Sequence, residues 1–327
     1  MPHQDREGFI SIGRIKMKTI LHSIILLFFL NSLYPQQDPE YTHYMYNMNV
    51  LNPAYATGTE SVLNIGTLYR TQWVGAVGAP KTLTFFSHIP VSKSVELGVS
   101  LISDDIGDGA KKENNFYMDF AYVIRLKNKQ NISFGLKAGF TSFQTDFNGF
   151  RLESGDPATD LAFSQNINNF KPNIGAGIYY FSNRYYIGLS APNLLSNKHI
   201  EERSGIHAFG SENIHTFLTA GYVFKIGNDC RLKPAFMTKY VPGTPLSTDI
   251  SVNILYNSRF ELGAAYRIDD AVSGLMSIGV SPSIRVGYAY DYTLSNLGQF
   301  NSGTHEIFLL FDLDLLGKGY DKSPRFF

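Results

Sequence analysis

A few acidic residues of the chain stand at spacings that could hold a metal ion or activate water. Residues 104–109 read Asp-Asp-Ile-Gly-Asp-Gly and resemble a calcium-binding loop. The register of such a loop fails here, because Ile106 stands where an oxygen ligand belongs and Asn115 stands where a bidentate glutamate is needed. A connection between two strands that is rich in glycine and aspartate explains the stretch better, so we predict no calcium site.

Side chains for catalysis or cofactor binding form no familiar pattern either. The eight His include no His-x-x-x-His pair, and the chain has neither a Gly-x-Ser-x-Gly nor a Gly-x-x-x-x-Gly-Lys-Ser/Thr motif. Asp312 and Asp314 share one face of a predicted strand and could form a catalytic pair, but structural charges explain them better. The single cysteine, Cys230, excludes an internal disulfide and a multi-cysteine metal site. We predict a protein that is not an enzyme and uses no cofactor.

The composition of the 327 residues narrows the class of protein. Lys plus Arg and Asp plus Glu both number 28, so the basic excess that a nucleic-acid binder needs is missing. Charged residues make up 17% and aromatic residues 14%, with 25 Phe and 20 Tyr, while the mean hydropathy is −0.10. Spans of about 20 apolar residues would raise the mean hydropathy of a multi-helix membrane protein. Strands that alternate apolar and polar residues fit this composition better.

Alternation of apolar and polar residues runs through most of the chain after residue 60. In Asn131–Phe140, for example, every second residue from Ile132 onward is Ile, Phe, Leu, Ala or Phe. Side chains of a strand point alternately to opposite faces, so this period predicts strands. Many segments have about ten residues, enough for a tilted strand to cross a bilayer. We expect fourteen strands, at 61–70, 81–90, 94–104, 113–126, 130–143, 172–181, 184–192, 213–226, 229–240, 246–257, 258–267, 272–281, 283–293 and 303–314.

The connections between these segments alternate in length. Those at Lys127–Lys129, Ser182-Asn183 and Gly227-Asn228 are short, whereas Gln144–Lys171 and Asn193–Glu212 are long. Outer-membrane barrels combine short periplasmic turns with longer outer loops, and an even number of strands returns both termini to the periplasmic side. The sequence therefore predicts an all-β transmembrane outer-membrane barrel.

The two faces of the predicted strands differ in chemistry. The apolar face should meet lipid, with Tyr and Phe near the strand ends; a soluble barrel with the reverse orientation is the alternative. Because the polar face carries charges of both signs, we expect a lumen closed by paired side chains or by a plug rather than a selective pore. Pro234 lacks a ladder donor and predicts a bulge or weaker pairing in its strand. The polar face holds Glu96, Lys137, Lys233, Lys239, Asp249, Glu261, Arg267, Arg285, Asp291, Glu306, Asp312 and Asp314.

The first 60 residues precede the predicted barrel of residues 61–327. Residues 1–36 resemble a secretory signal, because basic residues precede a short apolar run at Ile20–Leu30. Met17 is an alternative start of the protein. Residues 37–60 contain aromatic, Met and Asn residues without clean alternation, and could fold into the lumen as a plug or form a short periplasmic extension.

Several stretches resemble the PorP/SprF family of type IX secretion system membrane proteins from Bacteroidetes. The resemblance covers nearly all of the chain after the signal segment. The matching pieces are Leu51–Ala56 (LNPAYA), Tyr69–Gly75 (YRTQWVG), Gly78–Thr82 (GAPKT), Gly135–Gly139 (GLKAG), Pro172–Gly177 (PNIGAG), Pro192–Leu195 (PNLL), Gly287–Tyr292 (GYAYDY), Asn301–Ile307 (NSGTHEI) and Ser323–Phe327 (SPRFF).

The resemblance implies a non-enzymatic outer-membrane component of the type IX secretion system. Its expected partners are the C-terminal region of secreted or surface-attached cargo, periplasmic type IX components and outer-membrane lipid, with a role in gliding motility in some relatives. The architecture also resembles FadL-like transporters of hydrophobic small molecules, which is the alternative function. The only Trp, Trp73, could contact a partner or anchor the barrel at the membrane interface. The residues that we predict to bind partners are Asn52, Pro53, Tyr55, Arg70, Trp73, Pro80, Lys81 and Asn193.

Overall fold

The computed structural model describes residues 39–58, 62–146, 166, 168–195, 213–315 and 317. All of them belong to one compact unit that begins at Gln37, and the predicted signal segment 1–36 lies outside the described residues. The strands are β1 (Val62–Thr71), β2 (Lys81–Pro90), β3 (Val95–Ile106), β4 (Lys111–Arg125), β5 (Asn131–Thr145), β6 (Asn168–Phe181), β7 (Tyr185–Ala191), β8 (Thr216–Tyr222), β9 (Phe224–Ile226), β10 (Cys230–Tyr240), β11 (Ser247–Tyr256), β12 (Phe260–Arg267), β13 (Ala271–Ser281), β14 (Ile284–Thr293) and β15 (Thr304–Asp314).

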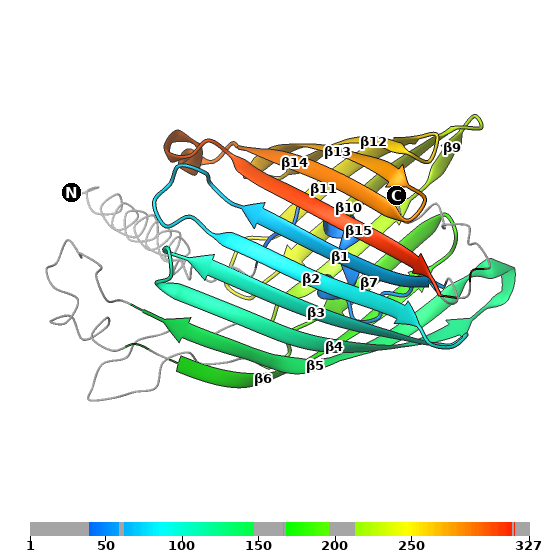
Figure 1. Ribbon diagram of the computed structural model, residues 1–327, viewed down its shortest axis with the longest axis horizontal. Helices are drawn as coiled ribbons and strands as arrows, with labels where there is room; N and C mark the ends of the chain where they lie inside the picture. The colour runs from blue at the N-terminus through cyan, green and yellow to red at the C-terminus, as the bar shows by residue number, and fades with distance from the viewer. Residues whose placement is uncertain are drawn as a thin grey trace, which may run out of the picture. The chain divides into compact units, whose positions relative to one another are not determined.

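These strands form a single antiparallel sheet that closes on itself (Figure 1). Each strand pairs with its neighbour in the chain, and β1 pairs with β15 from Val62 opposite Asp314 to Thr71 opposite His305. β8 and β9 both pair with β10 and are separated only by Val223, so they count as one interrupted strand. The described barrel wall therefore has fourteen strands. The predicted fourteen-stranded barrel is confirmed.

The break between β8 and β9 lies opposite Pro234. The pairing of β10 runs from Leu232 opposite Phe224 to Ala235 opposite Gly221 without a change of register, and it is interrupted between these pairs. A proline has no N–H to donate to the ladder, which accounts for the interruption. The predicted weakening is confirmed, and it takes the form of a gap rather than a bulge.

The two faces of the sheet differ as the sequence predicts. Lys137 is 2% exposed on the inner face of β5, whereas its neighbour Leu136 is 64% exposed on the outer face. The same alternation recurs around the barrel, and the exposed large residues of the strands are mostly Leu, Ile, Val, Phe and Tyr. An apolar outer band is the surface of a barrel that faces lipid rather than water. Within the described residues, no helix has the length and apolar character to cross a membrane.

The short helical elements are not part of the barrel wall. In the N-terminal part of the described chain, η1 (Tyr44–Tyr46) is followed by α2 (Met48–Leu51). η2 (Lys127–Lys129) forms the turn between β4 and β5, and η4 (Asn296–Phe300) lies in the connection between β14 and β15.

Long and short connections lie at opposite ends of the barrel. The short-turn end holds residues 91–94, 126–130, 182–184, 227–229, 257–259 and 282–283, and the start of β1. The long-connection end, at the left of Figure 1, holds residues 72–80, 107–110, 241–246, 268–270 and 294–303, together with the end of β5, the start of β6, the end of β7 and the start of β8. Residues 107–110 are therefore a strand connection, as predicted for the sequence that resembles a calcium loop.

We predict that the long-connection end faces the outside of the cell. In a Cys230→Ser background, Val77→Cys should react with a membrane-impermeant maleimide on intact cells, because Val77 is fully exposed at 101% in the 72–80 connection. Asn228→Cys, in an exposed turn at the other end, should react only after the outer membrane is permeabilised. Labelling of Asn228→Cys alone on intact cells would reverse the orientation.

Candidate functional site in the barrel lumen

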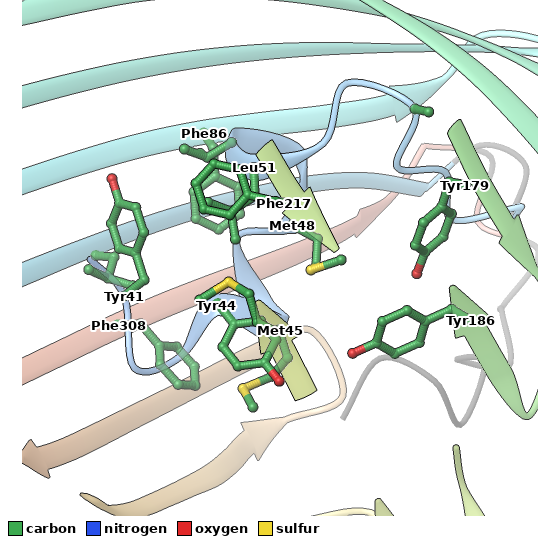
Figure 2. Close-up of a cluster of buried hydrophobic side chains, with 14 of the residues drawn as sticks. Tyr41, Tyr44, Met45, Met48, Leu51, Phe86, Tyr179, Tyr186, Phe217 and Phe308 are labelled. Carbon is green, nitrogen blue, oxygen red and sulfur yellow. The ribbon is translucent and has the colours of Figure 1, made fainter. Parts of the chain in front are cut away.

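Residues 39–58, here named the lumen segment, run inside the barrel. Their aromatic and Met side chains lack the alternation of a strand and instead form a buried cluster. Figure 2 shows Tyr41, Tyr44, Met45, Met48 and Leu51 among side chains of the inner wall. The wall contributes Phe86 of β2, Tyr179 of β6, Tyr186 of β7, Phe217 of β8 and Phe308 of β15. Burial of this apolar surface away from water favours the packed arrangement.

A network of charges joins the lumen segment to the wall near the long-connection end. Arg70 of β1 lies 2.8 Å from a carboxylate oxygen of Asp291 and 3.0 Å from one of Glu306, and all three side chains are at most 4% exposed. Glu306 accepts hydrogen bonds from the backbone N–H groups of Thr42, at 3.0 Å, and His43, at 2.7 Å. The Thr42 hydroxyl donates to Asp291 at 2.8 Å.

Glu40 forms a second link at the same end. Its two carboxylate oxygens lie 2.7 Å from the Lys239 ammonium of β10 and 2.8 Å from the Arg267 guanidinium of β12. Arg267 also lies 2.9 Å from Asp249 of β11. Burial alone would raise the pKa of the Glu40 carboxyl, but the two cations outweigh burial and lower that pKa to about 2. Glu40 is therefore ionised at neutral pH and carries a full charge into the network.

The end of the lumen segment is held at the short-turn end of the barrel. Glu96, near the start of β3, accepts hydrogen bonds from the backbone N–H groups of Thr57 and Gly58, each at 2.8 Å. His88 of β2 lies 2.6 Å from the same carboxylate. The segment thus passes through the lumen from the long-connection end to the short-turn end before β1 begins.

Two further contacts lie between these ends. Lys137 of β5 lies 2.8 Å from Asp119 of β4 and donates to the backbone carbonyl of Asn49 at 3.3 Å. The hydroxyl of Tyr46 donates to Glu261 of β12, which also accepts from Ser277 at 2.8 Å. A buried charge is strongly destabilising unless it is paired or hydrogen-bonded. The lumen segment therefore helps to compensate the buried charges of Lys137 and Glu261.

Three glycines of the inner wall lie against a turn of the lumen segment that begins at Asn52. The Asn52 side chain accepts from the Ala54 N–H at 2.9 Å, and the Tyr55 N–H donates to the Asn52 carbonyl at 3.0 Å, which forms a tight turn. A Cβ at Gly135 would lie 2.2 Å from the backbone of Pro53 and Ala54. We name Gly135 of β5, Gly177 of β6 and Gly188 of β7 the glycine cradle.

The other two cradle positions contact Asn52. A Cβ would lie 2.1 Å from the Asn52 carbonyl oxygen Oδ1 at Gly177 and 2.8 Å from its amide nitrogen at Gly188. Gly135 and Gly177 are directly opposite in the β5–β6 ladder, so they form one recess. At Gly135 the close neighbour is backbone, whereas at Gly177 and Gly188 it is the Asn52 side chain, so a larger residue at either of these two positions would displace Asn52.

A partly open cavity of about 70 Å³ lies beside the lumen segment. Residues at the short-turn ends of four strands line it, including Asn64 of β1, His88 of β2, Arg285 of β14 and Asp312 of β15. The other wall of the cavity comes from the lumen segment. No cluster of three or more His, Cys, Asp or Glu side chains in the described ranges could hold a metal ion.

The eight residues predicted to bind partners fall into two groups. Asn52, Pro53 and Arg70 are buried, and Tyr55 is half-buried, all with internal contacts. Trp73, Pro80 and Lys81 lie on or beside the 72–80 connection, where Lys81 pairs with Asp108 at 3.0 Å. Asn193 follows β7 and accepts a hydrogen bond from Asn173. Contact of these residues with another protein stays a prediction.

Sequence reasoning did not single out Glu40, Thr42, His43 or the glycine cradle as a site. The inward charges that bind the lumen segment are nevertheless those of the predicted polar face. The signal for the cradle was the placement of Gly135, Gly177 and Gly188 at positions of the strands that face the lumen, where a missing side chain leaves room for another backbone.

The fold and its occupied lumen define an outer-membrane β-barrel that contains its own N-terminal segment. The chain matches the model of the family described as type IX secretion system membrane protein PorP/SprF over residues 33–311. The chain belongs to this family, which confirms the resemblance seen in the sequence. No curated protein matches the chain.

Solved structures of bacterial barrels are similar to this chain at low sequence identity. A Pseudomonas aeruginosa FadL homologue has 10% identity and a TM-score of 0.45, covering 86% of this chain and 96% of its own. The CymD monoaromatic hydrocarbon channel has 12% identity and a TM-score of 0.48, covering 81% and 91%. Acinetobacter baumannii Omp33 has 8% identity and a TM-score of 0.43, covering 79% and 99%. Likeness at this level carries no statement about function.

The glycine cradle yields a stability prediction. Gly135→Ala should lower the free energy of unfolding by about 1–3 kcal/mol, because its Cβ meets backbone that cannot move aside. Urea unfolding from lipid vesicles measures the loss. The matched control is Gly274→Ala on β13, where a Cβ meets no atom within 4 Å and the change should stay within about 0.5 kcal/mol. Equal stability of the two variants would contradict the close fit.

Proposed function

We propose that this barrel serves type IX secretion by binding proteins at its two ends. Its long connections contact the C-terminal region of secreted or surface-attached cargo, and its short turns contact periplasmic components of the machinery. The lumen segment acts as a plug that keeps the barrel from conducting while these contacts are made. Membership of the secretion family supports the general role, and the occupied lumen supports a scaffold rather than a channel.

The single observation that carries the proposal is the way in which the lumen segment is held. Glu40 pairs with β10 and β12, Thr42 and His43 bind β14 and β15, and the segment's last two described residues bind Glu96 of β3. Anchors at both ends and a close fit in the glycine cradle hold the plug across the whole lumen. A rigid barrel closed in this way is suited to present loops for recognition.

The connection between β7 and β8 is the first candidate for the cargo contact. Replacing residues 196–212 by a Gly-Ser linker of equal length should abolish display of cargo on the cell surface, because it removes the side chains but keeps the spacing of the strands. Asn193 and Leu194 are retained, since Leu194 N–H donates to the Ile174 carbonyl at 2.8 Å and completes the rim. Cargo on intact cells is measured with an antibody.

The control for this experiment is a Gly-Ser replacement of residues 242–244 between β10 and β11, which should leave display unchanged. Heat-modifiable migration in gels shows that each variant still forms a barrel. Unchanged display after replacement of 196–212 would remove this connection as the contact.

Transport of hydrophobic small molecules is the second candidate function, and the cavity at the short-turn end is the observation that favours it. Transport requires a path that the lumen segment now fills. We predict that the purified protein shows no steady conductance in planar bilayers, and that deletion of residues 39–56 opens a steady one. Strong conductance of the unaltered chain, together with uptake of a labelled hydrophobic compound that depends on it, would favour the transporter.

A further inference from the structure

The lumen segment enters the barrel at the long-connection end. Its first described residues, Pro39 and Glu40, lie beside Ser247, the first residue of β11, and Arg267, the last residue of β12. Its last described residue, Gly58, is bound to Glu96 at the opposite end. Glu40 is therefore the part of the segment nearest to the face that carries the long connections.

Two cations hold Glu40 by separate oxygens. Lys239 lies 2.7 Å from Oε1 and Arg267 lies 2.8 Å from Oε2, so the pair grips one carboxylate from both sides. The Glu40 side chain is 13% exposed, and the two cations are 12% and 6% exposed. A small space of about 10 Å³, room for about one water molecule, adjoins the three side chains and is also lined by Tyr41, Phe217 and Met237.

The two cations depend on Glu40 unequally. Arg267 also pairs with Asp249 at 2.9 Å and with Asp270 at 3.3 Å. Lys239 has Glu40 as its one ion-pair partner among the described residues. A largely buried ammonium without an anion is unfavourable, so the position of Lys239 requires a carboxylate.

The segment after Glu40 does not rely on this carboxylate. Thr42 and His43 bind Glu306 and Asp291, and the turn at Asn52 fits the glycine cradle. Release of Glu40 would free only the first residues of the segment and leave the rest of the lumen filled. The grip on Glu40 is thus a separable contact at the edge of the plug.

We propose that Lys239 and Arg267 form a carboxylate-binding clamp on the floor of the long-connection end, and that an acidic side chain of a polypeptide partner replaces Glu40 in it. Glu40 occupies the clamp in the absence of the partner and prevents weak acidic ligands from binding. This inference rests on the proposed function, because it places a protein partner at the same face.

The test uses the purified full-length chain and a fluorescent peptide with the sequence of residues 38–42, Asp-Pro-Glu-Tyr-Thr. Glu40→Gln should bind this peptide at least about tenfold more tightly than the unaltered chain, because the clamp loses its internal carboxylate. The double variant Glu40→Gln/Lys239→Gln should lose about tenfold in affinity again. The same peptide with Gln in place of Glu is the matched probe and should bind none of them well.

A second measurement leaves Glu40 unchanged. In the Cys230→Ser background, the alkylation rate of Pro39→Cys should rise several-fold with saturating acidic peptide and stay constant with the Gln peptide. Equal binding of both peptides to Glu40→Gln, or an alkylation rate that neither peptide alters, would overturn the clamp. Because these assays use purified protein, they can fail while cargo display still depends on residues 196–212, and the reverse also holds.

Discussion

The structure depends on one constraint, which is that charges removed from water inside a barrel must be paired. Arg70, Lys137 and Arg267 each face a carboxylate directly opposite on the neighbouring strand, at Glu306, Asp119 and Asp249. Cross-strand pairs of opposite charge stabilise a sheet, but they leave further donors and acceptors of each group unused. The lumen segment supplies many of the remaining partners, and the wall and the lumen segment are therefore one electrostatic unit.

Shape adds to this electrostatic match. Charge pairs alone would allow the segment to shift along the lumen, because ionic contacts tolerate displacement. The glycine cradle limits that freedom, because the turn at Asn52 and Pro53 lies where three adjacent strands lack side chains. Phe308 and Phe217 of the wall also belong to the buried apolar cluster that the lumen segment forms between the anchors. The hydrogen bonds and ion pairs at the two ends of the barrel, with the glycine cradle between them, hold the lumen segment in one position along the lumen.

Most of the barrel could be predicted from the sequence, because a period of two is a local property. The strand containing Ile132, Phe134 and Leu136 needs only its own residues to show which face meets lipid. The lumen site is different, because Glu40 meets Lys239 and Arg267 across some two hundred residues of chain, and no local period brings them together. Arg70 shows this limit of sequence analysis. We predicted that it binds a partner protein, and in the structure its described ion-pair partners are Asp291 and Glu306 inside the barrel. The prediction of weaker pairing at Pro234 was confirmed, because a missing N–H donor affects only the adjacent strand pairing.

Much of the lumen segment is recognised through its main chain. Glu306 binds the N–H groups of residues 42 and 43, Glu96 binds those of residues 57 and 58, and the Ser190 hydroxyl donates to the Leu51 carbonyl at 2.8 Å. Every amino acid except proline offers the same amide N–H, so the main-chain part of these contacts does not depend on the side chain. Replacement of residue 43, 57 or 58 by an amino acid other than proline would therefore keep these backbone hydrogen bonds, and at these points the path of the lumen segment is set by Glu306 and Glu96 of the wall.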